Sequence, residues 1–166
     1  MQNPIVLVMG VSGSGKTTIG AMLAGRLGWK YAEADDFHPP ANVEKMHNGI
    51  PLTDEDRWPW LRAIGAWMQE QTDPAVVTCS ALKRKYRELL REDRPDLHLV
   101  YLDGSKELIS ARLAARHGHF FPKQLLDTQF ADLEPPQADE DALTVSIDQP
   151  IEKIVEEIHE RLGLAR

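Results

Sequence analysis

An unbroken apolar run, residues 5–9 (IVLVM), leads directly into the glycine-rich stretch GVSGSGKT, residues 10–17. Five consecutive apolar residues bounded by a glycine indicate a strand that is buried on both faces. The glycine-rich stretch fits the pattern G-x-x-x-x-G-K-[ST], and residues 16–27 have helical spacing. A strand, a glycine-rich turn and a helix in this order constrain the chain to an α/β fold with a phosphate-binding loop at the end of the strand.

Each part of this loop has a chemical role toward a nucleoside triphosphate. The glycines let successive backbone N–H groups point inward around a phosphate, and the helix dipole adds a favourable field for an anion. We expect Lys16 to reach the β- and γ-phosphates and the Thr17 hydroxyl to be a ligand of Mg²⁺. The loop residues predicted to bind ATP are Gly10, Val11, Ser12, Gly13, Ser14, Gly15, Lys16, Thr17 and Thr18. The loop does not identify the group that receives the phosphoryl.

The rest of the chain alternates between apolar runs and segments with helical spacing. The apolar runs, which predict strands, are residues 5–9, 30–34, 75–79, 97–102 and 143–147. The segments with helical spacing are residues 16–27, 54–71, 83–91, 106–117 and 151–162. This alternation predicts a mostly parallel sheet covered by helices on both faces.

Length and charge limit the class of protein. A chain of 166 residues is expected to form one domain. Its 19 basic and 26 acidic side chains give a net charge of −7, which argues against a broad grip on nucleic acid or on an anionic membrane. The apolar runs fall far short of the roughly 20 residues that cross a bilayer, and the N-terminus lacks the pattern of a signal peptide. Because the lone cysteine, Cys79, cannot form an internal disulfide, we expect a soluble protein of the reducing cytoplasm.

Two segments are longer than ordinary connections and predict where a second substrate binds. Residues 37–60 contain four prolines and a glycine, and residues 117–141 combine a glycine, aromatic residues and an acidic stretch with prolines. Long excursions from a compact α/β sheet are usually binding loops or lids. We therefore expect a substrate-binding excursion over 37–60 and a lid over 117–141.

Polar residues that follow the predicted strands supply candidates for acceptor binding, because ligands of open α/β sheets bind beyond the carboxyl ends of the strands. Asp35 is the candidate carboxylate that orients a hydroxyl and takes its proton, and His38 follows it. Lys83 and Arg87 are spaced one helical turn apart, which suits an anion. Arg57 is a candidate clamp for a carboxylate.

Arg112 and Arg116 lie one helical turn apart and lead into the second excursion. Such cations can arrive over the transferring phosphates when a lid closes and excludes water. We expect both to bind ATP, with Lys16, Asp35 and Arg116 as the catalytic residues. The predicted substrate-binding residues are Asp35, His38, Arg57, Lys83, Arg87 and His119. Two histidines, 117 and 119, are too weak a pattern to predict a metal site of their own.

Several motifs together resemble the gluconate kinase (gluconokinase) family of P-loop kinases. In the first half these are DDFHP (35–39), NVEKM (42–46), GIPLTD (49–54) and DRWPWL (56–61). In the second half they are CSALK (79–83), the Tyr86-Arg87 pair, GHFF (118–121) and LLDTQF (125–130). The resemblance extends from residue 8 to about residue 150, which makes it far more specific than the phosphate loop alone.

The resemblance implies transfer of the γ-phosphoryl group of ATP to the 6-hydroxyl of D-gluconate. It also implies a three-layer, nucleoside-monophosphate-kinase-like fold with a five-stranded parallel sheet in the order 2-3-1-4-5, and a homodimer. Carried over by position, Asp35 is the acidic residue near the acceptor and Arg57 is the arginine at the sugar acid. The family often has an apolar residue where this chain has Asp36, so the choice between Asp35 and Asp36 stays open.

The residues by themselves are compatible with other functions. A P-loop kinase for another small hydroxylated acceptor, such as shikimate or a nucleoside monophosphate, would need the same groups. A nucleotide-dependent switch would also carry the phosphate loop, but it would not need two substrate-like excursions. A panel of acceptors separates these alternatives.

Overall fold

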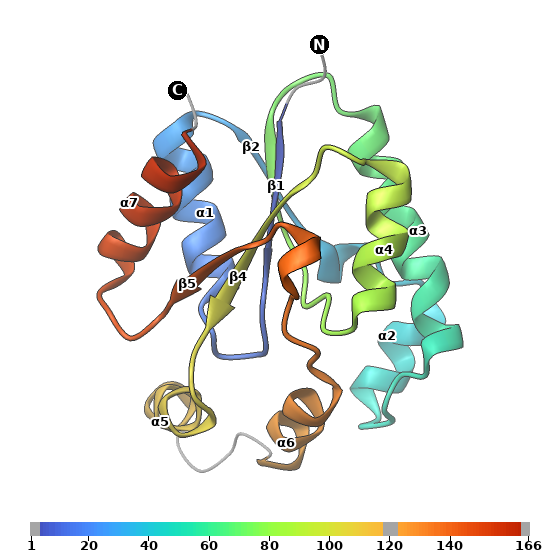
Figure 1. The fold of residues 1–166 in the computed structure, drawn as a ribbon. Coiled ribbons are helices and arrows are strands. Elements are labelled where there is room, and N and C mark those ends of the chain that lie inside the picture. The colour runs from blue at the N-terminus through green and yellow to red at the C-terminus, as the bar shows by residue number, and fades with distance from the viewer. Residues whose placement is uncertain (1–3, 118–122, 164–166) are drawn as a thin grey trace.

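The central feature of the fold is a sheet of five parallel strands in the order β2-β3-β1-β4-β5 (Figure 1). The computed structural model describes residues 4–117 and 123–163, with the side chains of 116, 117 and 123–125 outside the described part. The strands are β1 (Ile5–Met9), β2 (Lys30–Glu33), β3 (Ala75–Thr78), β4 (His98–Asp103) and β5 (Leu143–Ser146). The predicted strand order is confirmed.

Helices connect the strands and cover both faces of the sheet. They are α1 (Lys16–Leu27), α2 (Pro40–His47), α3 (Asp54–Glu70), α4 (Arg84–Asp93), α5 (Lys106–His117), α6 (Lys123–Asp132) and α7 (Ile151–Leu162), with short 3₁₀ turns η1 (Ala34–Phe37) and η3 (Ala138–Glu140). Figure 1 shows α1 and α7 on one side of the sheet and α3 and α4 on the other.

The core explains why β1 reads as a continuous apolar run. Successive side chains of a strand point to opposite faces, and here both faces are covered. Val6 and Val8 pack in the cluster formed with α1 and α7, whereas Ile5, Leu7 and Met9 pack in the cluster formed with α3 and α4. All five residues of β1 are completely buried. The three-layer α/β fold predicted for this chain is therefore confirmed.

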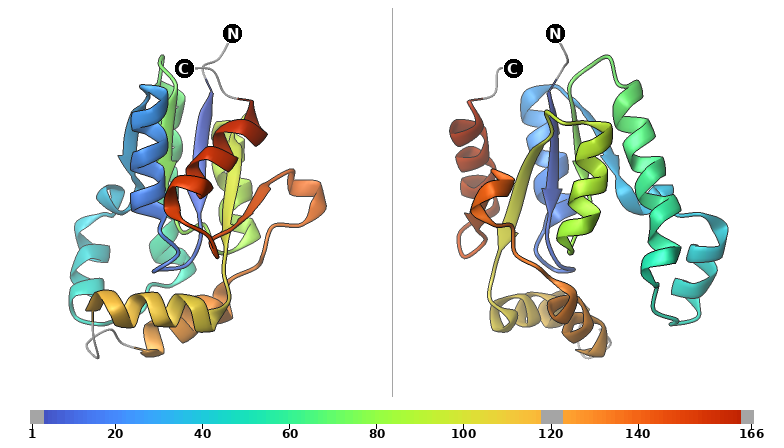
Figure 2. Two further views of the ribbon diagram at one scale, coloured as in Figure 1. Left: turned by 90° about the vertical axis from the view of Figure 1, so that its left-hand side faces the viewer. Right: turned by 45° about the vertical axis from the view of Figure 1, so that its right-hand side comes forward.

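Two pairs of elements extend beyond the carboxyl end of the sheet. Figure 2 shows α2 with the start of α3 on one side, and α5 with α6 on another, both at the end where the loop after β1 turns into α1. These elements belong to the two long excursions of the sequence. The fold thus puts both excursions at the same edge as the glycine-rich loop.

Helices α2 and α6 were not predicted, because the prolines and glycines of the excursions indicated loops. Pro40 opens α2 at its first turn, where a missing N–H costs nothing because that position has no intrahelical acceptor. The other boundaries agree with the expected ones to within about two residues. Within the described ranges, the structure contains no helix that is both long and apolar enough to span a membrane.

The contact between α1 and β3 yields a test of this packing. A methyl group on Gly20 would lie 2.5 Å from Cγ2 of Thr78 and 3.2 Å from Cε1 of Tyr31, so there is no room for it. We expect Gly20→Ala to lower the free energy of unfolding by about 1–3 kcal/mol, the usual cost of overpacking. Urea denaturation measures this change.

The matched control lies in the same helix. Gly25 is exposed, and a methyl group there meets nothing within 4 Å. Gly25→Ala should raise the free energy of unfolding by about 0.5–1 kcal/mol, because alanine is the better helix former. Equal effects of the two substitutions would contradict the packing described here.

Candidate active site

The phosphate loop joins β1 to α1 in a conformation that requires glycine. Gly13 and Gly15 have φ angles of 83° and 95°, in the left-handed region that other residues rarely adopt. Gly15 is the residue before α1, so the N-terminal end of that helix faces the loop. A methyl group on Gly13 would lie 2.6 Å from Cγ of Leu113, which places α5 directly against the loop.

Lys16 folds back onto the loop that it follows. Its Nζ donates hydrogen bonds to the backbone oxygens of Gly10 (2.9 Å) and Val11 (3.2 Å). Burial lowers the pKa of Lys16, although the charges of Asp35, Cys79 and Glu33 act in the opposite direction. The charge of the carboxylate predicted to orient the acceptor therefore acts on the lysine predicted to bind phosphate.

The other loop residues act through different groups. Val11 and Ser14 are buried, and the Ser14 N–H donates to the backbone oxygen of Val11 (3.2 Å). Thr17 and Thr18 are exposed in the first turn of α1, and Ser12 is half-buried. Two exposed threonines are thus present at the N-terminal end of α1, directly after the loop.

Helix α6 reaches the loop through one side chain, Gln129. The Ser12 N–H donates to Oε1 of Gln129 (2.6 Å), and Nε2 of Gln129 donates to the Ser12 hydroxyl (2.8 Å). This two-point contact joins residues 117 positions apart in the chain. It ties the second excursion to the phosphate loop.

On the acceptor side, Asp35 and Asp36 lie in η1, directly after β2, and both are exposed. The charge of Asp35 acts on Lys16 and on His38. Asp36 is not among the groups that perturb either of these residues. Of the two carboxylates, it is therefore Asp35 whose charge acts on the loop lysine and on His38.

His38 is held by an aromatic stack. Its ring lies 4.3 Å from the nearest ring of Trp60, at an interplanar angle of 13°, and the Trp60 indole N–H donates to the backbone oxygen of Ala34 (2.7 Å). Burial lowers the pKa of His38, and the charge of Arg57 lowers it further, against the effect of Asp35. The pKa of the ring is therefore lowered, and the charges of one acidic and one basic residue act on it in opposite directions.

Arg57 and Lys83 meet around the ring of Tyr86. Arg57 donates to the Tyr86 hydroxyl (2.8 Å), and Nζ of Lys83 lies 5.8 Å from the centre of the same ring. Lys83 is paired with Asp54 (3.3 Å), which also accepts from Lys85 and from the Tyr86 hydroxyl. These partners hold the pKa of Asp54 well below its usual range. Burial and the bond to Asp54 raise the pKa of Tyr86 to about 12.

The expectation that Arg87 binds the substrate is wrong, because its guanidinium is buried and hydrogen-bonded to other groups of the protein. Arg87 is 1% exposed and forms a two-point ion pair with Glu140, with Nε–Oε1 at 2.6 Å and Nη2–Oε2 at 3.1 Å. It also donates to the backbone oxygens of Ala81, Leu82 and Glu134. The residue joins α4 to the chain that returns from the second excursion.

Of the two arginines expected to act with the lid, the structure describes the side chain of Arg112 but not that of Arg116. Arg112 donates to the backbone oxygen of Ile147 (2.6 Å), just beyond β5. The backbone of Arg116 continues α5, but its side chain lies outside the described part of the chain. His119 also lies outside the described residues.

Several residues of this site were not found from the sequence. Each of the following side chains contacts a predicted site residue from another part of the chain or another element: Gln129, Tyr86, Asp54, Trp60 and Asn42. Their only signal was membership in the motifs that resemble gluconokinases. Chemistry and spacing alone did not single them out.

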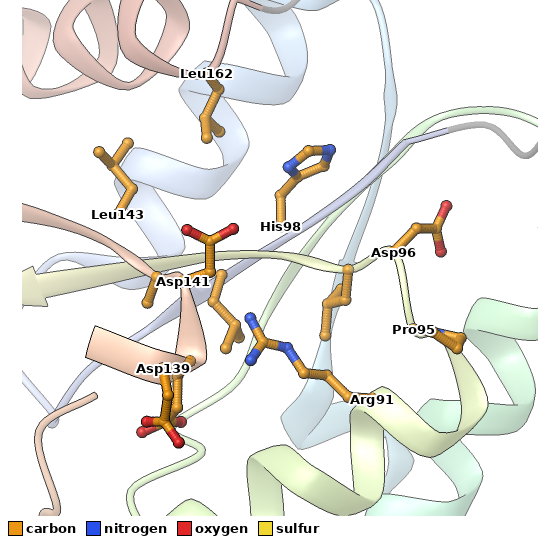
Figure 3. Close-up of a pocket in the computed structure, with 12 residues that line it drawn as sticks. Arg91, Pro95, Asp96, His98, Asp139, Asp141, Leu143 and Leu162 are labelled. Atoms are coloured by element: carbon orange, nitrogen blue, oxygen red, sulfur yellow. The ribbon is translucent and has the colours of Figure 1, made fainter. Parts of the chain in front are cut away.

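A separate cavity of about 540 Å³ lies where β4 and β5 begin, at the opposite end of the sheet (Figure 3). Arg91, His98, Asp139, Asp141 and Leu143 are among the residues that line it. Neither the phosphate loop nor η1 contributes to the lining. Because ligands of open α/β sheets bind at carboxyl ends, the cavity is not the active-site candidate.

The burial of Arg87 predicts a structural effect of its removal. Arg87→Ala would leave the buried carboxylate of Glu140 without its cation and remove a donor from the backbone oxygens of Ala81, Leu82 and Glu134. We expect the free energy of unfolding to fall by about 3–5 kcal/mol, with little change in the KM for the acceptor in the protein that remains folded. Thermal unfolding and steady-state kinetics measure the two quantities.

Arg84 provides the matched control, because it pairs with the exposed carboxylate of Asp139 in the same 3₁₀ turn. Exposed ion pairs contribute little, so Arg84→Ala should leave the unfolding midpoint nearly unchanged. A stable Arg87→Ala protein with a raised KM for the acceptor would restore Arg87 as a substrate-binding residue.

Comparison with known proteins identifies the family. The sequence matches the model of the shikimate kinase family over residues 12–162. It is 50% identical to a gluconokinase of Gluconobacter oxydans (strain 621H), over 92% of this chain and 88% of the relative, and 48% identical to the thermoresistant gluconokinase of Escherichia coli (strain K12), over 91% and 89%. The crystal structure of a gluconokinase from Sinorhizobium meliloti 1021 superposes with a TM-score of 0.90 at 46% identity, covering 96% of this chain and 91% of the other. The resemblance expected from the sequence is confirmed: the chain belongs to the gluconokinase family of P-loop kinases.

Proposed function

We propose that this protein is an ATP-dependent kinase that transfers the γ-phosphoryl group to the 6-hydroxyl of D-gluconate, giving 6-phosphogluconate and ADP. The observation that carries the proposal is that the charge of Asp35 acts on both Lys16 and His38, while Arg57 and Lys83 both lie over the ring of Tyr86. The names of the similar proteins, gluconokinases, support gluconate as the acceptor. The whole chain, residues 1–166, would act as one kinase domain.

The phosphate loop would hold ATP. Its backbone N–H groups would bind phosphate oxygens, and Lys16 would exchange its bonds to Gly10 and Val11 for phosphate oxygens. Arg112 and Arg116 would stabilise the negative charge that develops on the transferring group. Both arginines, like Lys16, act through electrostatic stabilisation and positioning, so no covalent enzyme intermediate is needed.

Thr17 is the residue that would hold Mg²⁺. It is exposed in the first turn of α1, and within residues 4–117 and 123–163 no cluster of three or more His, Cys, Asp or Glu side chains could hold a metal ion by itself. This fits Mg²⁺, which is commonly bound by few protein groups together with phosphate oxygens and water. When bound, the ion neutralises phosphate charge.

Asp35 would orient the 6-hydroxyl of gluconate and accept its proton. The hydroxyl oxygen forms the new bond to phosphorus as the bond between the γ-phosphorus and the bridging oxygen breaks, and ADP keeps that oxygen. The exposed carboxylate of Asp35 is accessible to a ligand. Its electrostatic effect on Lys16 supports a position across from the phosphates.

Arg57 and Lys83 would bind the carboxylate of the sugar acid. Arg57 gives one bond to Tyr86, which leaves other N–H groups of its fork for a ligand. Lys83 is held by Asp54, so the acid of the substrate would share this cation with a protein carboxylate. His38 would contact a hydroxyl of the chain between the two ends, and His119 would join the site from the lid.

The two excursions would have separate tasks, with 37–60 binding the sugar acid and 117–141 closing over the phosphates. The contact between Gln129 and Ser12 supports the second task, because it already joins the lid segment to the phosphate loop. A cytoplasmic location and a homodimer are further parts of the proposal. The lone cysteine supports the first, since Cys79 cannot form an internal disulfide.

An acceptor panel tests the proposed reaction. ADP release is measured with Mg-ATP and D-gluconate, shikimate, AMP or a simple hexose, because the family model makes shikimate the rival acceptor to exclude. We expect turnover with gluconate alone, and no turnover for Lys16→Ala, which loses the cation on the β- and γ-phosphates.

Turnover with another acceptor would contradict gluconate as the substrate while keeping the phosphate-loop assignment. Slow ATP hydrolysis that no small acceptor changes would favour the nucleotide-dependent switch. Gluconate turnover that survives Lys16→Ala would overturn the role of the loop itself.

A further inference from the structure

Asn42 is a buried polar residue in α2 whose amide links two parts of the first excursion, the segment before α2 and the start of α3. It is 3% exposed. Its Nδ2 donates to the backbone oxygen of Asp56 at 2.8 Å and lies 3.3 Å from Nδ1 of His38. A buried amide is retained only where its hydrogen bonds are satisfied, so these two contacts fix its orientation.

The contacts of Asn42 decide where His38 carries its proton. The backbone oxygen of Asp56 can only accept, so the atom next to it must be the NH₂ end of the amide. That nitrogen has no free lone pair to accept a bond, and its second hydrogen faces Nδ1 of His38. Nδ1 must therefore be the unprotonated nitrogen. In a neutral ring, the single proton is then on Nε2.

The direction of the Nε2–H group is also fixed. The ring of His38 stacks on Trp60, and Trp60 is itself anchored by its bond to Ala34. The charged groups that act on the ring are Asp35 and Arg57. Within the described part of the chain, no acceptor is bonded to Nε2. The group is thus a donor held in place beside the candidate acceptor site.

We propose that Asn42 is a positioning residue that holds His38 as the neutral Nε2–H tautomer, so that His38 donates a hydrogen bond to a hydroxyl of the sugar acid. Asp35 can only accept and His38 can only donate, so the pair presents complementary groups to a polyol, whose hydroxyls do both. The identity of this ligand rests on the proposed function. The tautomer is a property of the protein alone.

The tautomer is read directly by ¹⁵N NMR of the protein labelled at its six histidines. Two-bond correlations from the ring carbon protons separate a protonated from an unprotonated nitrogen, and the signals that disappear in His38→Gln belong to His38. At neutral pH we expect a protonated Nε2 and an unprotonated Nδ1. A protonated Nδ1, in either a neutral or a charged ring, would overturn the proposal.

Asn42→Asp tests the consequence for catalysis, because it replaces the donor with an acceptor of the same shape. The carboxylate should draw the proton to Nδ1, so the tautomer inverts. The kcat/KM for gluconate should fall about tenfold, the effect of one lost hydrogen bond, with an unchanged KM for ATP. An inverted tautomer with an unchanged kcat/KM for gluconate would overturn the positioning role.

The matched control is Asn48→Asp, which adds the same charge at the exposed end of α2 and should change neither the tautomer nor the kinetics. The new carboxylate at position 42 faces the backbone oxygen of Asp56 and can destabilise the fold. If that variant does not fold, the spectrum of the unsubstituted protein still decides the tautomer. Absence of gluconate turnover in the unsubstituted protein would be a failure of the proposed function, and it is measured separately from the spectrum.

Discussion

The complete burial of β1 at the centre of the sheet is the constraint on which the site depends. A strand covered on both faces cannot shift its register, so the loop that follows it leaves the sheet at a fixed point. Because all five strands are parallel, the segments after β2 and β3 leave at the same edge. Asp35 and Lys83, which follow β2 and β3, therefore lie at the same edge of the sheet as the phosphate loop.

The parts of the fold that depend on local pattern could be predicted from the sequence. The run before Gly10 and the helix after Gly15 were found with their observed bounds, because burial on both faces and the glycine requirement leave clear marks in the chain. The observed end of β4 lies one residue beyond the predicted end, because the polar residue Asp103 still pairs with β5. Helix α2 could not be predicted in this way, because prolines such as the two at its N-terminus, Pro39 and Pro40, are typical of loops as well as of helix starts.

Contacts between distant segments could not be predicted in the same way. Helical spacing put Arg87 beside Lys83, but Lys83 precedes α4 and Arg87 turns inward to Glu140, 53 residues away. The bond of Gln129 to Ser12 and that of Asn42 to Asp56 likewise depend on tertiary packing. Each of these side chains satisfies a buried or half-buried polar group, a requirement that has no periodic signature.

The central claim is that Asp35, across from Lys16, orients the acceptor hydroxyl and takes its proton. The most direct measurement is the kcat for gluconate in Asp35→Asn beside that in the neighbouring Asp36→Asn, with ATP binding measured in both. We expect Asp35→Asn to lower kcat about 10²-fold or more, as for loss of a general base, with nearly unchanged ATP affinity, whereas Asp36→Asn should stay close to the unsubstituted enzyme. An unchanged kcat in Asp35→Asn, or the large loss in Asp36→Asn instead, would contradict the claim.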